Sequence, residues 1–310
     1  MRLPAVRVRV PATTSNLGPG VDVFGRALSL HPELELRVST TRGEALVEIE
    51  GEGASTLPRG EDNEVVRVLR RVCHIANGLR LRLTNRIPVA RGLGSSAAAR
   101  LAALLAARAV WKEPSTEGDS RENDSLLDQA CALEGHPDNV VPALLGGLRL
   151  SVRDGDRLLQ VPLKSPKGLA AVVCVPDFEL STEKARAVLP ATVDRADAVF
   201  TSGRVALLVH ALETGRYELL RVAMQDVLHQ PYRRALVPGL RTVLEEAAAA
   251  GAFGAALSGA GPSVLAFAPR GARAAAVGRA MQRGFLNHRI ESRALALDVD
   301  RKGAVAERIE

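Results

Sequence analysis

The segment at residues 88–98 constrains the fold more than any other part of the chain. It reads P-V-A-R-G-L-G-S-S-A-A and runs directly into an alanine-rich stretch that has no helix breaker before Pro114. The alternating apolar residues at 79–84 predict a β-strand before it, and the serines at 95 and 96 predict the start of a helix. The chain therefore has to change from strand to helix across a short glycine loop.

A loop of this kind is suited to hold an anion. Gly92 and Gly94 have no Cβ, so backbone N–H groups can approach a phosphate closely. The helix that follows adds about half a positive charge at its N-terminus. The nucleotide motif G-x-x-x-x-G-K-[S/T] is absent, because no lysine follows the glycines. Taken alone, the loop is also compatible with an ordinary strand–turn–helix connection and a serine cap.

Two further glycine clusters occur far from the first. Near the N-terminus, an alternating strand at 6–10 leads into P-A-T-T-S-N-L-G-P-G-V-D at 11–22. Near the C-terminus, L-S-G-A-G-P-S at 257–263 precedes an apolar run at 264–267. Two polar segments lie between them, E-G-H-P-D-N at 134–139 and S-T-E-K-A-R at 181–186. The ordered set is far more specific than any one of these loops.

In this order, the segments resemble the superfamily of galactokinase, homoserine kinase, mevalonate kinase and phosphomevalonate kinase, the GHMP kinases. The likeness is closest to the homoserine kinases and covers residues 6–297. It implies phosphorylation of the L-homoserine hydroxyl to O-phospho-L-homoserine, with ATP and Mg²⁺ as cofactors. It also implies a homodimer and an α+β fold, with a ribosomal-S5-domain-2-like N-terminal domain and a ferredoxin-like C-terminal domain. The alternatives are a mevalonate-type small-alcohol kinase and a non-catalytic relative that senses a ligand.

The pattern of strands and helices predicts mixed sheets in both halves. Residues 34–39 and 45–50 are expected to form a hairpin across the turn at 41–43. The segment K-S-P-K-G at 164–168 is short, polar and turn-forming. It predicts a nucleotide-binding domain at 1–165 and a second domain at 166–310 that completes the substrate site.

Composition excludes several classes of function. The formal charge is +6, but the arginines are spread along the whole chain and only 3% of residues are aromatic, which argues against nucleic-acid binding. The chain has no apolar run of about 18 residues and no apolar segment typical of a signal peptide near Met1, so we expect a cytoplasmic protein without a membrane partner. The three cysteines include no C-x-x-C pair, which favours buried thiols over zinc.

The resemblance assigns the nucleotide and the metal to specific residues. Asn63 matches an adenine-contacting asparagine, although capping of a helix explains it nearly as well. Magnesium takes one or two protein oxygens, and the matching positions are Ser96 and Asp128. The family pattern has a glutamate at the second position, so Asp128 departs by one methylene, about 1.5 Å of reach. A solvated carboxylate is the alternative, with Glu134 as the next candidate. The remaining ATP contacts would come from Pro88, Val89, Ala90, Arg91, Gly92, Leu93, Gly94, Ser95, Ala97, Ala98, Gly259 and Gly261.

The amino-acid substrate needs its carboxylate and ammonium groups recognised. The resemblance places Asn16, Asp22, His136, Asp138, Arg186 and Arg233 at the substrate, with Asp22 suited to the ammonium and the arginines to the carboxylate. Asn139 would lie near the transferring phosphate and act in catalysis together with Arg186. Capping of a new helix alone could explain His136 and Asp138. No lysine–aspartate pair of general-base type is visible, so we expect catalysis by positioning and electrostatics.

The chain departs from the family pattern at the first glycine loop. It reads T-T-S-N where the family pattern is closer to T-S-A-N, and Val21 replaces a usual aromatic residue. Neither change removes a polar contact, so the expected recognition of the substrate is retained while the shape of the pocket differs.

Overall fold

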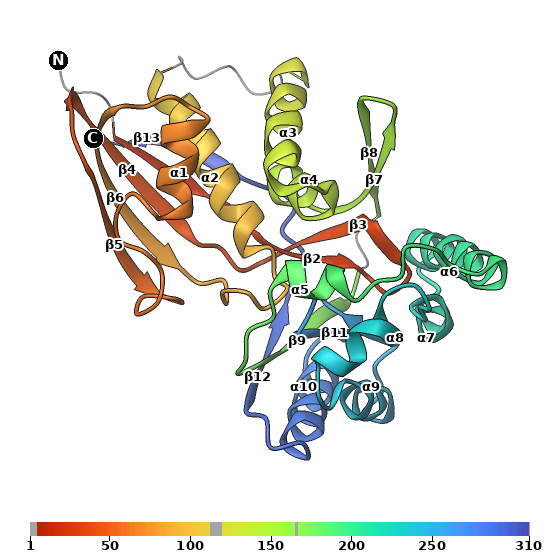
Figure 1. Ribbon diagram of the computed structural model, residues 1–310. Coiled ribbons are helices and arrows are strands. Elements are labelled where there is room, and N and C mark those ends of the chain that lie inside the picture. Colours follow the sequence, from red (N-terminus) through yellow and green to blue (C-terminus); the bar gives the residue numbers. More distant parts are fainter. Residues whose placement is uncertain (1–4, 112–119, 165–166, 310) are drawn as a thin grey trace.

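A five-stranded sheet forms one end of the molecule (Figure 1). In the computed structural model, which describes residues 5–111, 120–164 and 167–309, its strand order is β13-β1-β4-β6-β5. The predicted hairpin of residues 34–39 and 45–50 is wrong, because β6 lies between these two strands. The alternating leucines of β6 bury one face of that strand, and β5 pairs with it in parallel after the crossover through α1. The strands are β1 (Ala5–Arg9), β4 (Glu33–Arg42), β5 (Ala45–Gly51), β6 (Asn77–Asn85) and β13 (Val305–Ile309).

Two helices, α1 (Glu64–Arg71) and α2 (Ser95–Trp111), cover one face of this sheet (Figure 1). The buried face of α2 consists largely of alanines, with Leu101 and Leu104 in the core. Small side chains let the helix approach α1, β1 and its other neighbours closely. The predicted helix after the glycine loop is thereby confirmed, starting at Ser95. Within the described ranges, no helix has the length and apolar character needed to cross a bilayer.

A second sheet carries the middle of the molecule. Its order is β2-β3-β7-β8, all antiparallel, formed by β2 (Ala12–Asn16), β3 (Gly20–Leu28), β7 (Leu148–Asp154) and β8 (Arg157–Leu163). Helix α3 (Ser120–Glu134) leads into α4 (Pro137–Leu145), which packs on β3. A Cβ on Gly25 would collide with the carbonyl oxygen of Asp138 and lie 2.7 Å from Pro142 Cγ. Glycine at this position therefore lets the start of α4 reach the sheet.

A third sheet forms the opposite end of the molecule. Its order is β10-β11-β9-β12, from β9 (Leu169–Pro176), β10 (Gly254–Leu257), β11 (Val264–Pro269) and β12 (Ser292–Leu297). Every residue of β9 is buried, as its continuous apolar run predicts. With α9 (Leu240–Ala249) before β10 and α10 (Ala272–Leu286) before β12, the succession is β-α-β-β-α-β, the ferredoxin-like arrangement. The predicted α+β fold class is confirmed.

The segment between β9 and α9 contains further helices, of which α5 and α8 reach the site. The helices are α5 (Thr182–Ala187), α6 (Arg195–Thr214), α7 (Leu220–Ala223) and α8 (Gln230–Arg233), with 3-10 turns at Tyr217–Leu219 and Arg234–Leu236. Helix α5 lies between the second and third sheets (Figure 1). The predicted domain boundary falls at residues 165 and 166, which lie outside the described residues. Because β13 pairs with β1, the last strand of the chain returns to the first sheet.

Candidate active site

The three glycine loops meet around a cavity of about 550 Å³. Its walls come from β2, the loop before α2, the first turns of α2 and α4, helices α5 and α8, and the loop before β11. Pro88, Ala97, Asp128 and Gly261 do not line it. The predicted site residues that do line it are Asn16, Asp22, Asn63, Val89, Ala90, Arg91, Gly92, Leu93, Gly94, Ser95, Ser96, Ala98, His136, Asp138, Asn139, Arg186, Arg233 and Gly259.

Short hydrogen bonds fasten the three loops to one another. The Ser258 hydroxyl oxygen lies 2.7 Å from the carbonyl oxygen of Gly92 and 2.9 Å from Thr14 Oγ1. The backbone N–H of Gly259 donates to the carbonyl of Ser15 at 3.1 Å. Segments separated by more than a hundred residues are thus held together around the cavity.

The phosphate loop is shaped by Gly94. Its φ of +69° is in the left-handed region, which other residues adopt only at a cost. A Cβ on Gly94 would collide with Thr13 Oγ1 and lie 3.2 Å from Asn139 Oδ1. Helix α2 begins at the next residue and has no acidic side chain in its first turn. The positive end of α2 therefore faces the cavity without a carboxylate from its own first turn.

Asn63 caps helix α1. Its Oδ1 accepts a hydrogen bond from the backbone N–H of Val65 at 3.0 Å, and its Nδ2 donates to the carbonyl of Pro58 at 2.8 Å. The capping interpretation is confirmed. Both amide atoms of Asn63 are engaged in the loop, so a contact with adenine would use the second N–H of Nδ2 or the second lone pair of Oδ1.

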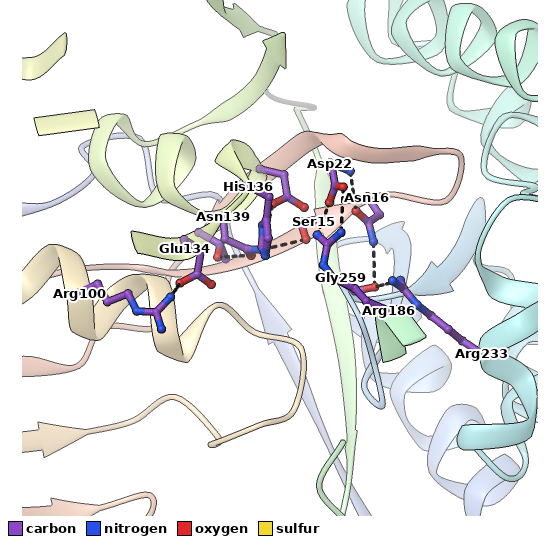
Figure 2. A network of polar contacts seen from close by, with 12 residues as sticks. Ser15, Asn16, Asp22, Arg100, Glu134, His136, Asn139, Arg186, Arg233 and Gly259 are labelled. Carbon is purple, nitrogen blue, oxygen red and sulfur yellow. Dashed lines mark hydrogen bonds and ion pairs between the residues drawn. The ribbon is translucent and has the colours of Figure 1, made fainter. Parts of the chain in front are cut away.

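Two carboxylates of helix α3 are candidate ligands for the metal. Asp128 is exposed and points away from the cavity, whereas Glu134 lines it with a side chain that is 9% exposed. A separation of six residues turns the helix by about 240°, which places the two side chains on different faces. Arg100 holds Glu134, with its Nη1 2.6 Å from Glu134 Oε2 and its Nε 2.7 Å from Glu64 Oε1 (Figure 2). The structure thus brings Glu134 to the N-terminal part of α2, and not Asp128.

The opposite side of the cavity carries paired charges. Arg186 Nη2 lies 2.6 Å from Asp22 Oδ1, and Nη1 lies 3.1 Å from Oδ2 (Figure 2). Burial raises the pKa of Asp22, but the hydrogen bonds and charge of Arg186 lower it by more, so the net pKa lies below its ordinary value. His136 Nδ1 lies 2.5 Å from Asp138 Oδ1. Burial lowers the pKa of His136, but Asp138 raises it by more, so its net pKa lies above its ordinary value.

Asn139 lies between these two ends of the cavity. Its Oδ1 accepts a hydrogen bond from Thr13 Oγ1 at 2.8 Å, and its Nδ2 donates to Ser15 Oγ at 3.2 Å. Sequence analysis did not single out Thr13 or Ser15. The available signal was a run of three hydroxyl residues, 13–15, directly after the apolar strand at 6–10. All three side chains are buried, and a buried hydroxyl requires a partner.

Arg233 is almost fully buried and is held on several sides. Its Nε donates to the carbonyl of Ala185 at 3.0 Å, and its Nη1 lies 3.3 Å from the carbonyl of Gly259 and 3.0 Å from His229 Nδ1. Among the described residues, only Nη2 has no protein acceptor. The expected fork toward a carboxylate is therefore reduced to one nitrogen. Sequence analysis did not identify His229 as part of the site, although it begins the H-Q-P-Y-R segment.

An apolar wall adjoins the phosphate loop. Its side chains come from strands of the first sheet and the connections beside them, and no sequence motif marks them among the other core residues. They are Val8, Val10, Leu34, Leu57, Leu83, Ile87 and Val89.

A GHMP kinase is the class of protein that this fold and cavity define. Residues 63–147 match the family model described as "GHMP kinases N terminal domain", and residues 208–287 match "GHMP kinases C terminal". The homoserine kinase of Moorella thermoacetica is 45% identical over 302 residues, covering 96% of this chain and 98% of the relative. That of Carboxydothermus hydrogenoformans is 42% identical, covering 97% and 96%.

A solved structure agrees with these relatives. The crystal structure of homoserine kinase from Cytophaga hutchinsonii superposes with a TM-score of 0.83 at 31% identity, covering 98% of this chain and 97% of that one. The chain belongs to the homoserine kinase family.

Proposed function

We propose that this protein transfers the γ-phosphoryl group of ATP to the hydroxyl of L-homoserine, forming O-phospho-L-homoserine. The observation that supports it most directly is that one cavity joins two unlike ends. One end presents a glycine loop and a helix N-terminus. The other presents an acid and a base, Asp22 and Arg186, which match the two charges of an amino acid.

The first end of the cavity fits a nucleoside triphosphate. Gly94 lines this end with no room for a Cβ beside Thr13 and Asn139, and the positive end of α2 faces the same part of the cavity. The apolar wall beside this loop suits a flat purine. The residues that would hold the phosphates are Gly92, Gly94 and Ser95, through their backbone N–H groups. When bound, magnesium-ATP supplies the phosphoryl group and neutralises its oxygens.

For the metal we propose Ser96 and Glu134 in place of the earlier pair that included Asp128. The Ser96 side chain is exposed at the start of α2, and Glu134 lines the same cavity. A hydroxyl and one carboxylate are the ligand set that magnesium commonly takes from a protein. Arg100 would keep the Glu134 carboxylate in place through their 2.6 Å contact.

The second end fits a zwitterion. The substrate ammonium would take the place of Arg186 beside Asp22, and the substrate carboxylate would take the place of Asp22 beside Arg186 and the Nη2 group of Arg233. Asp22 and Arg186 would each lose the other as a partner and gain an oppositely charged group of the substrate. A mevalonate-type substrate has a carboxylate but no ammonium, so its binding would leave Asp22 unpaired in a half-buried position.

Catalysis in this proposal rests on positioning. Asn139 is fixed by Thr13 and Ser15 between the two ends of the cavity, where the acceptor hydroxyl and the phosphoryl group would meet. Arg186 adds positive charge on the same side, which would stabilise the charge of the transferring group.

A coupled assay of ADP release tests the proposal across L-homoserine, mevalonate, galactose and shikimate. We expect saturable, magnesium-dependent turnover with L-homoserine. Turnover with mevalonate and none with homoserine would contradict the assignment. Binding of homoserine without ADP release would favour the ligand-sensing alternative.

We also propose that the protein is a cytoplasmic homodimer, as the family resemblance implies, and that its two domains meet near residue 165. Sedimentation of the purified protein tests the dimer, and expression of residues 1–165 with β13 absent tests whether that part folds alone.

A further inference from the structure

His229 is a fully buried imidazole at the centre of the substrate end of the fold. Its Nε2 lies 2.8 Å from the carbonyl oxygen of Gly18, in the first glycine loop. Its Nδ1 lies 3.0 Å from Arg233 Nη1. The carboxylate of Asp226 accepts hydrogen bonds from the backbone N–H groups at the start of α8, including that of His229, and so fixes the backbone from which the ring projects.

These contacts determine the tautomer of the ring. A carbonyl oxygen only accepts hydrogen bonds and a guanidinium only donates them. Nε2 must therefore carry the proton toward Gly18, and Nδ1 must be the acceptor toward Arg233. A protonated ring would present an N–H to Arg233 and would break this contact.

Arg233 in turn depends on a small set of acceptors. The carbonyls of Ala185 and Gly259 and the ring of His229 together fix the plane of its guanidinium. Ala185 precedes the site residue Arg186, and Gly259 also accepts from the side chain of Asn16 at 2.9 Å. The orientation of Nη2 is thus set by three parts of the chain, namely helix α5, the loop before β11 and the ring of His229.

We propose that neutral His229 is the positioning residue that aims the Nη2 group of Arg233 at the carboxylate of the amino-acid substrate. This inference rests on the proposed function for the identity of the substrate. His229 does not line the cavity, so it acts through Arg233 and not by contact with the substrate.

The surroundings of His229 favour its neutral form. Burial lowers the pKa of His229, and the positive charge of Arg233 lowers it further. The carboxylate of Asp226 and the carbonyl of Gly18 act in the opposite direction, as does Asp22 on β3, and the net pKa lies below the ordinary value.

Three substitutions separate positioning from a general structural role. His229→Asn keeps a short amide that can accept from Arg233, His229→Gln can reach toward Gly18, and His229→Leu can do neither. We expect His229→Leu to raise the KM for L-homoserine about tenfold or more, with kcat and the KM for ATP changed less than about twofold. The KM for L-homoserine should be close to that of the parent in His229→Asn, and it should be intermediate in His229→Gln.

His288→Leu is the matched control. This histidine is exposed and contacts Thr242 far from the cavity, so its replacement should leave all three kinetic constants unchanged. Parallel changes in both KM values, or equal effects of the Asn, Gln and Leu substitutions at 229, would overturn the inference in favour of a purely structural histidine.

A spectroscopic measurement on the unsubstituted protein reads the protonation of the ring directly, and His229→Asn serves to assign its resonance. In ¹⁵N-histidine-labelled protein, the resonance that His229→Asn removes should report a neutral ring protonated at Nε2 at pH 7. A ring protonated at Nδ1, or at both nitrogens, would overturn the inference. Failure of the parent enzyme to turn over homoserine would contradict the proposed function instead. Homoserine turnover with an unchanged KM in His229→Leu would contradict this inference alone.

Discussion

Arg186 of α5 and Asp22 of β3 form a two-point ion pair at one end of the cavity, with contacts of 2.6 and 3.1 Å between residues 164 positions apart in the chain. Both side chains are partly exposed, at 39% and 40%, so solvent screens the pair and its contribution to stability is small. In the proposed function its importance lies in binding. Two charges suited to an amino acid neutralise each other in this pair, and we expect a zwitterion to replace both at once.

Asp22→Asn tests that exchange. We expect kcat/KM for L-homoserine to fall at least about tenfold, since a hydrogen bond between charged groups contributes about 1.5–3 kcal/mol. For 4-hydroxybutanoate, which has the hydroxyl and the carboxylate but no ammonium, the same substitution should have little effect or improve binding. A loss of equal size for both compounds would show that Asp22 does not recognise the ammonium.

Gly94→Ala tests the phosphate loop. The added methyl group would collide with Thr13 Oγ1, and the alanine would have to adopt a φ of +69°. We therefore expect nucleotide binding to be lost while the protein remains folded. Calorimetric titration with an ATP analogue measures the binding. Gly203→Ala is the control, because this glycine lies in helix α6 with nothing within 4 Å of the added atom. An unchanged affinity in Gly94→Ala would exclude the loop as the phosphate site.

Glu134→Gln and Asp128→Asn distinguish the two candidate metal ligands. Glu134→Gln should lower kcat by about 10² or more, as expected when a positioned charge is lost from a transition state. Raised magnesium should restore part of this loss. Asp128→Asn should remain close to the parent, because its side chain is exposed outside the cavity. The opposite result, with Asp128→Asn impaired at low magnesium, would return the metal to Asp128.

Local chemistry explains why the loops could be predicted from sequence. A glycine that admits a phosphate, a serine at a helix start and a proline after His136 are each recognisable within a few residues. Their common location followed from the resemblance, and the structure places them around one cavity. The helix after the phosphate loop and the buried strand β9 were predictable for the same reason, because their patterns extend over many residues.

The features that were missed depend on tertiary contacts. Strand β5 pairs with β6 and not with β4 because of which strands can share a buried face. The alternation of apolar and polar residues predicts a strand but does not specify which strand lies next to it. Arg100 is one of many arginines until α3 brings Glu134 beside it. The family resemblance matches Asp128 to a metal position, but it does not show which face of α3 turns toward the cavity.

Arg26→Met should stabilise the protein. The Arg26 side chain is buried, and burial lowers its pKa to about 10. Among the described residues, none accepts a hydrogen bond from its three nitrogens, and its guanidinium lies 5.2 Å from the ring centre of Phe267. A desolvated cation–π contact contributes about 2 kcal/mol or more, whereas burying an ion costs several kcal/mol.

We expect the free energy of unfolding, measured with urea, to rise by about 1–3 kcal/mol in this variant. Arg241→Met, which removes an exposed pair with Glu245, should change it by less than about 1 kcal/mol. A clear loss of stability in Arg26→Met would show that the charge of Arg26 is required.

The pair of His136 and Asp138 predicts a pH dependence of stability. Because the net pKa of folded His136 lies above its ordinary value of 6.5, the folded state binds this proton more tightly than the unfolded state does. The resulting stabilisation is complete below pH 6.5 and is lost as the pH rises through the raised pKa. The difference in free energy of unfolding between the parent and His136→Gln should therefore be larger at pH 6 than at pH 9. Glu134 also raises this pKa, by less than Asp138 does. In the background of Asp138→Asn, the difference should therefore decrease much less with pH. A decrease as large as in the parent background would show that Asp138 does not set the pKa of His136.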